Sequence, residues 1–226
     1  MQPRAIIFDF DGVLLESELE FNRIAAGLLT ELGHPVTVEE ALTHFVGLNG
    51  KDVVQAIESR IGAPLPPEYQ RRMKASGQRV LREGIAAVAG AIEFVRSLPP
   101  DMPRAVASSS STRWMRGHLA HLGIEAAFGD NLYSGAEHVE RGKPAPDLYL
   151  HAAAQLGVSI ADCAIIEDSR VGATGALASG GWVIGLAAGS HCLNGHANML
   201  RGVGVELIAH SFADVARLLE LDQPSR

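Results

Sequence analysis

The sequence predicts an α/β protein with a doubly wound, parallel-sheet, Rossmann-like core and an inserted helical-bundle cap domain. Three observations predict this fold class. Short apolar runs each stop at a polar cluster, helical patterns lie between most of these runs, and one long stretch contains helical patterns only. Continuous apolar runs are typical of strands that are covered on both faces. Their alternation with helices indicates a parallel sheet with helices on both sides.

The apolar runs give the expected strands, which are residues 5–8, 105–107, 163–166, 182–186 and 205–209. The expected helices between them are residues 114–122, 146–156 and 171–179. In a doubly wound sheet, ligands bind at the carboxyl ends of the strands. Polar residues directly follow the carboxyl ends of three of the expected strands. They are Asp9, Ser108, and the pair Glu167 and Asp168. We therefore expect the functional site at this edge of the sheet.

The long helical stretch runs from about residue 17 to residue 83. Its expected helices are residues 19–32, 38–45, 51–61 and 67–82. Because this block follows the first strand, we interpret it as an inserted cap. The expected catalytic core comprises residues 1–15 and 84–226, and the expected cap comprises residues 16–83. The hinges between them are expected at residues 14–18 and 82–87.

The composition is that of an ordinary globular protein. Of the 226 residues, 47% are hydrophobic and 20% are charged, and a chain of this length folds without a disulfide or a structural metal. Cys163 lies in an apolar run and is expected to be buried, while Cys192 lies in an expected loop. This cysteine usage fits a reducing compartment. The apolar run near residue 5 is too short for a signal peptide or a membrane span, so we expect a cytoplasmic protein that is not bound to a membrane. The net charge of −7 argues against nucleic acid as a partner.

The acidic pair Asp9 and Asp11 is the most informative feature. Residues two apart at the end of a strand project to the same side, so both carboxylates can face one crevice. Two close carboxylates need a cation or a shared proton to relieve their repulsion. Mg²⁺ prefers oxygen ligands and leaves room for a substrate phosphate. A calcium loop of the EF-hand type also begins Asp-x-Asp, but it needs glycine at its sixth position, where this chain has Leu14.

The other strand ends supply the remaining groups for phosphate chemistry. Ser108 offers a hydroxyl, and the main-chain amides of Ser109 and the serines after it can bind phosphate oxygens at a helix start, although these serines also suit helix capping. Lys143 is a cation between a glycine and a proline, and Glu167 and Asp168 are further oxygen ligands for a metal. Together with a carboxylate nucleophile, these groups are typical of phosphoryl transfer.

With these residues in order, the sequence resembles the haloacid dehalogenase superfamily, in the branch that carries a helical cap after the first strand. The resemblance extends over nearly the whole chain. It rests on four motifs in order, which are Asp9-Phe10-Asp11-Gly12-Val13-Leu14, Ser108, Lys143 within Gly-Lys-Pro-Ala-Pro-Asp, and Glu167-Asp168-Ser169 with Gly172. The resemblance implies a Mg²⁺-dependent phosphatase that acts on a small phosphorylated metabolite through an aspartyl-phosphate.

The resemblance also implies a role for each of these residues. Asp9 corresponds to the nucleophile and Asp11 to the general acid and base, while Ser108 and Lys143 correspond to the groups that hold the phosphoryl oxygens. The implied magnesium ligands are Asp9, the main-chain carbonyl of Asp11, and Asp168. Glu167 is implied to act through water and ranks below Asp168.

Three positions distinguish this chain from other members of the family and reduce the number of possible reactions. Dehalogenase and phosphonatase members lack a carboxylate at the position of Asp11, so its presence here argues against carbon–halogen cleavage. The β-phosphoglucomutases of this branch carry a cap histidine twelve residues after the nucleophile, where this chain has Phe21. This difference favours a phosphatase over a mutase. The hinge residue Glu16 stands where the family usually has aspartate.

The hinge, the cap and the late loop that contains His191 and His196 resemble sugar-phosphate and sugar-acid-phosphate phosphatases of the 6-phosphogluconate type. A phosphoglycolate phosphatase is an alternative. Asn49, Lys51 and Arg72 of the cap are candidates for contacting the leaving group. The two histidines are expected to be ordinary surface residues and not ligands. The oligomeric state is not predicted.

A phospho-acceptor signalling module of the receiver type is an alternative of another class. It shares the doubly wound sheet, the magnesium and the acidic cluster. The order of the acidic residues along the chain and the inserted cap both argue against it.

Overall fold

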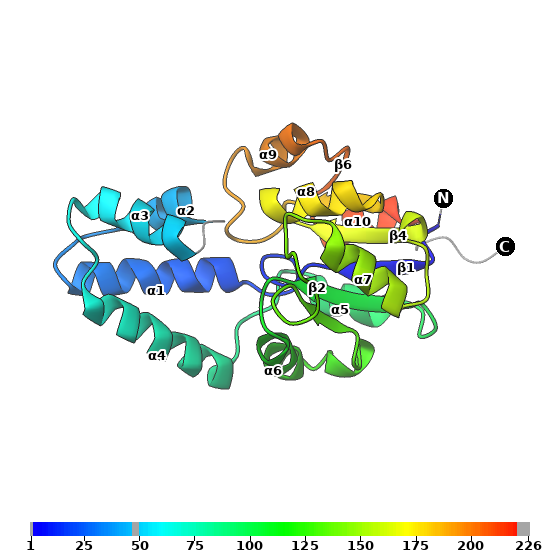
Figure 1. The fold of residues 1–226 in the computed structure, drawn as a ribbon, viewed down its shortest axis with the longest axis horizontal. Helices are drawn as coiled ribbons and strands as arrows, with labels where there is room; N and C mark the ends of the chain where they lie inside the picture. Colours follow the sequence, from blue (N-terminus) through cyan, green and yellow to red (C-terminus); the bar gives the residue numbers. More distant parts are fainter. Residues whose placement is uncertain (1, 47–49, 221–226) are drawn as a thin grey trace.

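The computed structural model describes residues 2–46 and 50–220 of the chain. It contains a layered α/β core joined to a separate bundle of helices (Figure 1). The sheet is parallel, with the strand order β3-β2-β1-β4-β5-β6. Its strands are β1 (Ala5–Phe8), β2 (Arg104–Ser108), β3 (Leu132–Ser134), β4 (Cys163–Glu167), β5 (Trp182–Leu186) and β6 (Leu207–Ala209). The predicted fold class is confirmed.

Helices cover both faces of this sheet (Figure 1). The core helices are α5 (Ala91–Ser97), α6 (Thr112–Leu122), α7 (Asp147–Gln155), α8 (Arg170–Ser179), α9 (His196–Val203) and α10 (Phe212–Leu218), with short 3₁₀ turns at Glu125–Ala127 and Ile160–Asp162. Along β1, Ile6 and Phe8 belong to one buried apolar cluster and Ala5 and Ile7 to the other. Successive side chains of a strand point to opposite faces. Because both faces are covered, β1 is apolar at every position.

The cap is a bundle of four helices between β1 and α5. They are α1 (Ser17–Glu31), α2 (Val38–Phe45), α3 (Gly50–Ile61) and α4 (Pro67–Glu83). The bundle has its own buried cluster, which includes Leu29, Phe45 and Tyr69. At the start of α2, the Thr37 hydroxyl accepts from the Glu40 amide while the Glu40 carboxylate accepts from the Thr37 amide. This capping box satisfies two amides that the helix leaves unpaired.

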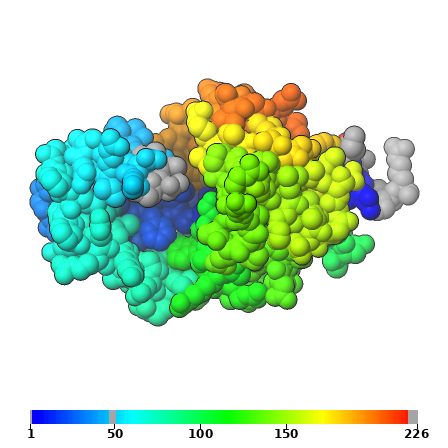
Figure 2. All heavy atoms as spheres, in the orientation of Figure 1, coloured from blue at the N-terminus to red at the C-terminus, as the bar shows by residue number. Residues whose placement is uncertain are grey.

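Two chain segments connect the cap to the core, and they are hydrogen-bonded to each other. The Glu16 amide donates to the carbonyl oxygen of Ala86 at 3.0 Å, and the Val88 amide donates to that of Leu14 at 3.1 Å. In the space-filling view the surface is hollowed between the cap and the core (Figure 2). The helices of the cap begin and end close to the predicted hinges. The division into domains at residues 15/16 and 83/84 stays a prediction.

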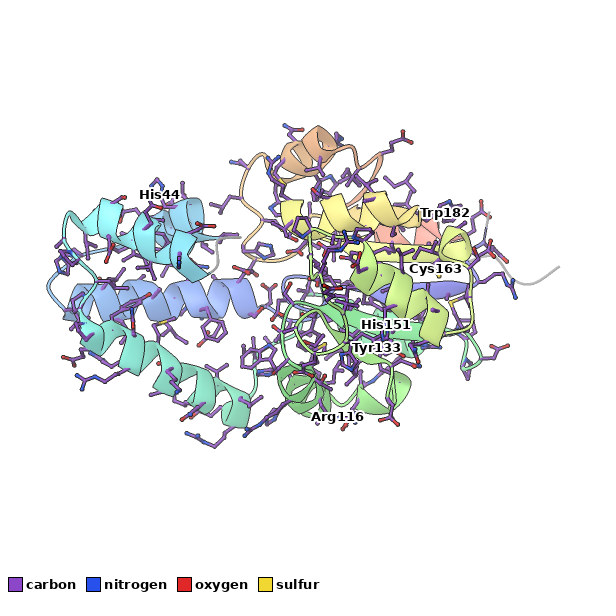
Figure 3. All side chains as sticks on the ribbon, viewed as in Figure 1. His44, Arg116, Tyr133, His151, Cys163 and Trp182 are labelled. Atoms are coloured by element: carbon purple, nitrogen blue, oxygen red, sulfur yellow. The ribbon has the colours of Figure 1, made fainter. Side chains whose placement is uncertain are left out.

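The sequence patterns missed several short elements. The three residues of β3 lie at the edge of the sheet, and the helices α5, α9 and α10 have only seven or eight residues each. Elements this short carry at most about two periods of an apolar pattern, so tertiary packing provides most of their stability. Cys163 on β4 is fully buried, as predicted (Figure 3). Within residues 2–46 and 50–220, no helix is both long enough and apolar enough to span a bilayer.

Candidate active site

Asp9 is the first residue after the central strand β1. Its amide donates to the Ile166 carbonyl oxygen of β4 at 2.9 Å, which continues the sheet pairing to the strand end. Its side chain is almost fully buried and accepts from the Lys143 ammonium, with 2.5 Å between Nζ and Oδ1. The same ammonium lies 2.7 Å from Oε1 of Glu167. Lys143 therefore joins the carboxylates at the ends of two neighbouring strands.

Glu167 is held by donors on both carboxylate oxygens. The Tyr149 hydroxyl donates to Oε1 at 2.7 Å, and the amide and hydroxyl of Ser169 each lie 3.0 Å from Oε2. Helix α8 passes close above it, since a Cβ atom built on Gly172 would lie 1.6 Å from Oε1. Only glycine fits at that position. Because protein donors occupy both oxygens, Glu167 is a weaker candidate than Asp168 for direct contact with a metal.

Asp168 has one carboxylate oxygen occupied and one without a partner. Its Oδ2 lies 2.9 Å from Nε2 of His191. Its Oδ1 is buried and has no hydrogen-bond partner within the described part of the chain. Asp9, Glu167 and Asp168 each present an oxygen within 4.8 Å of the others. A buried carboxylate oxygen without a donor, in a cluster of hard oxygen ligands, fits a site for Mg²⁺.

The charges of this cluster are not balanced by the protein alone. Burial raises the pKa of Asp9 and of Asp168 well above the usual range, and the neighbouring carboxylates raise both further while Lys143 opposes the shift. Burial alone would also raise the pKa of Glu167, but Lys143 and the donors around it hold that pKa below its usual value. Burial by itself would lower the pKa of Lys143. The negative charges of Asp9 and Glu167 have a larger, opposite effect, so the pKa of Lys143 lies well above its usual value. A divalent cation would therefore stabilise the ionised forms of Asp9 and Asp168.

Asp11 lies on the other side of this group, toward the loop between β2 and α6. Its Oδ2 accepts from the hydroxyls of Ser108 at 3.2 Å and Ser110 at 2.6 Å. Its Oδ1 accepts from the indole Nε1 of Trp114 at 3.2 Å. The Trp114 ring packs in turn on His118, with 4.1 Å between ring centroids. Three donors from one loop and helix therefore fix the direction of this carboxylate.

The structure brings together most of the residues that the sequence singled out. The cluster consists of Asp9, Asp11, Ser108, Lys143, Glu167 and Asp168. Ser109 follows Ser108 and is exposed, and Lys51 is exposed near the start of α3. Asn49 lies outside the described residues. Arg72 forms an ion pair with Glu31 on the cap. The roles of all these residues stay predictions.

The contacts of Ser110, Trp114 and Tyr149 were not predicted from the sequence, and the prediction for His191 is wrong. His191 was expected at the surface, but it is 3% exposed and contacts Asp168. Trp114 lies in the first turn of the helix that follows Ser108, which was a usable signal, because a side chain there can reach back toward the strand end. For Tyr149 and His191 the sequence contains no such signal.

This chain resembles known proteins in sequence and in fold. The sequence profile described as haloacid dehalogenase-like hydrolase matches residues 6–186. A 6-phosphogluconate phosphatase of Escherichia coli is 27% identical, over 83% of this chain and 84% of that protein. Hexitol phosphatase A of the same species is 28% identical, over 95% of this chain and 94% of that protein. A HAD family hydrolase of Deinococcus radiodurans, solved with bound phosphate and sodium, is 30% identical with a TM-score of 0.84, over 96% of this chain and 95% of that chain.

Proposed function

The chain belongs to the haloacid dehalogenase-like hydrolases, as one of their phosphatases, and from this premise we propose that it hydrolyses a sugar phosphate or sugar-acid phosphate with Mg²⁺. The reaction passes through an aspartyl-phosphate on Asp9. The observation that carries this proposal is the buried Asp9 carboxylate, which Lys143 holds at the end of the central strand. It lies in one cluster with the carboxylate of Asp168, one oxygen of which has no hydrogen-bond partner among the described residues.

The first half of the reaction transfers the phosphoryl group to the protein. A carboxylate oxygen of Asp9 attacks phosphorus, and the bond from phosphorus to the sugar oxygen breaks. Asp11 donates a proton to that leaving oxygen, so that the sugar departs as an alcohol. Lys143 and the Ser108 hydroxyl stabilise the charge on the phosphoryl oxygens. Mg²⁺, held by Asp9, the Asp11 carbonyl and Asp168, would neutralise further negative charge there.

The second half returns the enzyme to its starting state. Asp11, now ionised, accepts a proton from a water molecule, and the resulting hydroxide attacks phosphorus. The bond to Asp9 breaks and inorganic phosphate leaves. Ser110 and Trp114 orient the Asp11 carboxylate, and this orientation serves both proton transfers.

A mutase would have to return the phosphoryl group to a sugar instead of to water. In this chain the cap residue Phe21 packs on Trp114, with 5.7 Å between ring centroids. A phenyl ring can neither give nor take a proton. This contact supports water as the final acceptor. The 6-phosphogluconate and hexitol phosphatases among the relatives support a sugar-derived substrate.

Phosphate release by the purified protein with Mg²⁺ tests the proposal, first on an aryl phosphate and then on sugar phosphates, sugar-acid phosphates and phosphoglycolate. We expect Asp9→Asn to abolish turnover, because the amide is not a nucleophile. Asp130→Asn is the matched control, since the Asp130 side chain is exposed and pairs with Arg116. Turnover by Asp9→Asn equal to that of the control would refute the nucleophile. Conversion of β-glucose 1-phosphate to glucose 6-phosphate faster than phosphate release would identify a mutase.

A further inference from the structure

The loop between β5 and α9 places two histidines against Asp168. Nε2 of His191 lies 2.9 Å from Oδ2 of the Asp168 carboxylate. Nε2 of His196 lies 2.7 Å from the main-chain oxygen of the same residue. With a proton on each Nε2, both rings donate to Asp168, one to its side chain and one to its backbone. This loop therefore holds Asp168 at two points.

Tight packing leaves the His191 ring little freedom. Its side chain is 1% exposed. A Cβ atom on Gly12 would lie 3.0 Å from Cε1 of His191 and 2.0 Å from Oδ2 of Asp168, and one on Gly189 would lie 2.5 Å from the same Cε1. Two glycines from distant parts of the chain thus enclose the ring and the carboxylate together.

From these contacts we propose that His191 is a positioning residue for the metal ligand Asp168. By donating to Oδ2, it fixes the orientation of the carboxylate and so leaves the unpartnered Oδ1 free to bind a metal in the cluster with Asp9 and Glu167. Groups that bind a ligand's other atoms fix its orientation in metal sites, and their loss weakens metal binding by roughly 10–100-fold. This inference rests on the proposed magnesium site and adds the group that orders it.

The residue before His191 ties this loop to the hinge of the cap. The Ser190 amide lies 3.1 Å and 3.0 Å from the two carboxylate oxygens of Glu16, and its hydroxyl lies 3.0 Å from Oε1. Glu16 is buried and directly precedes α1, and its own amide is bonded to the returning hinge segment at Ala86. The contacts from Glu16 through Ser190 and His191 to Asp168 therefore connect the hinge with the metal ligand. A change at Glu16 should reach the metal site through this loop.

The same loop offers a second use of its side chains. His191, Cys192 and His196 present nitrogen and sulfur atoms within 4.8 Å of one another, which is a set of ligands suited to zinc. The geometry favours the positioning role, because one nitrogen of each histidine is already directed at Asp168. Calorimetric titration with Zn²⁺ distinguishes the two uses. Zinc binding that needs Cys192 and leaves the magnesium affinity independent of His191 would overturn the positioning role.

The test measures Mg²⁺ binding by calorimetry on the substrate-free protein, together with thermal unfolding and the kinetics at saturating Mg²⁺. We expect His191→Phe to raise the dissociation constant for Mg²⁺ roughly 10–100-fold, while kcat at saturating Mg²⁺ falls much less. His191→Gln keeps a donor and should recover part of the affinity. It also keeps the test decisive if the phenylalanine variant does not fold. His44→Asn, at an exposed position in the cap helix α2, is the control.

A double-mutant cycle tests the link to the hinge. Glu16→Ala should weaken Mg²⁺ binding in the wild-type background and have little further effect in His191→Phe. Equal effects in both backgrounds would overturn the link. A wild-type protein that neither binds Mg²⁺ nor releases phosphate would overturn the proposed function as well. Suppose instead that the wild type binds Mg²⁺ and releases phosphate, and that His191→Phe and His191→Gln bind Mg²⁺ as tightly as the wild type. This result would overturn only the positioning role.

Discussion

The core and the cap hold their ion pairs in different surroundings. In the core, the side chains of Lys143 and Glu167 are 4% and 0% exposed and meet at 2.7 Å. In the cap, Arg60 and Glu40 meet at 2.6 Å, but their side chains are 36% and 38% exposed. The distances are alike, so distance does not distinguish the pairs. Water screens the exposed pair, whereas the buried pair depends on its partners alone.

The buried charges of the core serve the functional site, whereas the exposed charges of the cap do not. Burying ions costs free energy that an ion pair rarely recovers in full. A protein that buries three carboxylates beside one ammonium is less stable than one with an apolar core there, but it keeps a site that attracts a cation and a phosphate. The cap has no such cluster among its described residues. Its charges lie at the surface, where their loss changes little.

The largest effect is expected from removing the ammonium of the core. Lys143→Met leaves Asp9 and Glu167 buried without their cation, and breaking a buried pair in this way costs about 3–5 kcal/mol of stability. We also expect turnover to be lost, because the nucleophile is no longer held. Thermal unfolding and phosphate release measure the two effects. Arg60→Met in the cap is the matched change. Equal destabilisation by the two variants would remove the distinction between core and cap.

An intermediate effect is expected at the boundary between the two regions. Trp114→Phe keeps the ring that packs on Phe21 and His118 but removes the Nε1 donor to Asp11. A hydrogen bond to a charged group contributes about 1.5–3 kcal/mol. We therefore expect kcat to fall roughly ten- to hundredfold with little change in KM or in Tm. Trp182→Phe, on β5, controls for the loss of an indole. Unchanged kcat in Trp114→Phe would show that Asp11 does not need this donor.

The smallest effect is expected in the cap and depends on pH. The amide of Thr37 and the Arg60 guanidinium lower the pKa of Glu40 from 4.5 to about 2. Since the folded pKa lies below the unfolded one, this stabilisation is present above about pH 4.5 and disappears as the pH falls toward 2. Glu40→Gln should therefore lower Tm slightly at pH 7 and by less at pH 2.5. Glu39→Gln is the control. A larger loss at low pH would contradict the sign.

The sequence predicted the elements with long or uninterrupted patterns. The bounds of β1, β5 and α2 agree residue by residue with the predicted ranges 5–8, 182–186 and 38–45. The strand ends also indicated the carboxylates and Ser108 as candidates. Lys143 was indicated by its place between Gly142 and Pro144. The pattern failed for the three-residue strand β3 and for α5, α9 and α10. Length alone does not explain this, because α9 has eight residues, as α2 does.

The sequence by itself determined which chemical groups stand at the strand ends, because an apolar run stops where a strand leaves the covered sheet. It thus determined Asp9, Asp11, Ser108, Glu167 and Asp168 as candidates. Only the tertiary structure decided how these groups are oriented. Tyr149 bonds Glu167, Trp114 bonds Asp11 and His191 bonds Asp168 across loops and helices far apart in the chain. A hydrogen bond depends on the position of two atoms in space, and a pattern along the chain carries no such information.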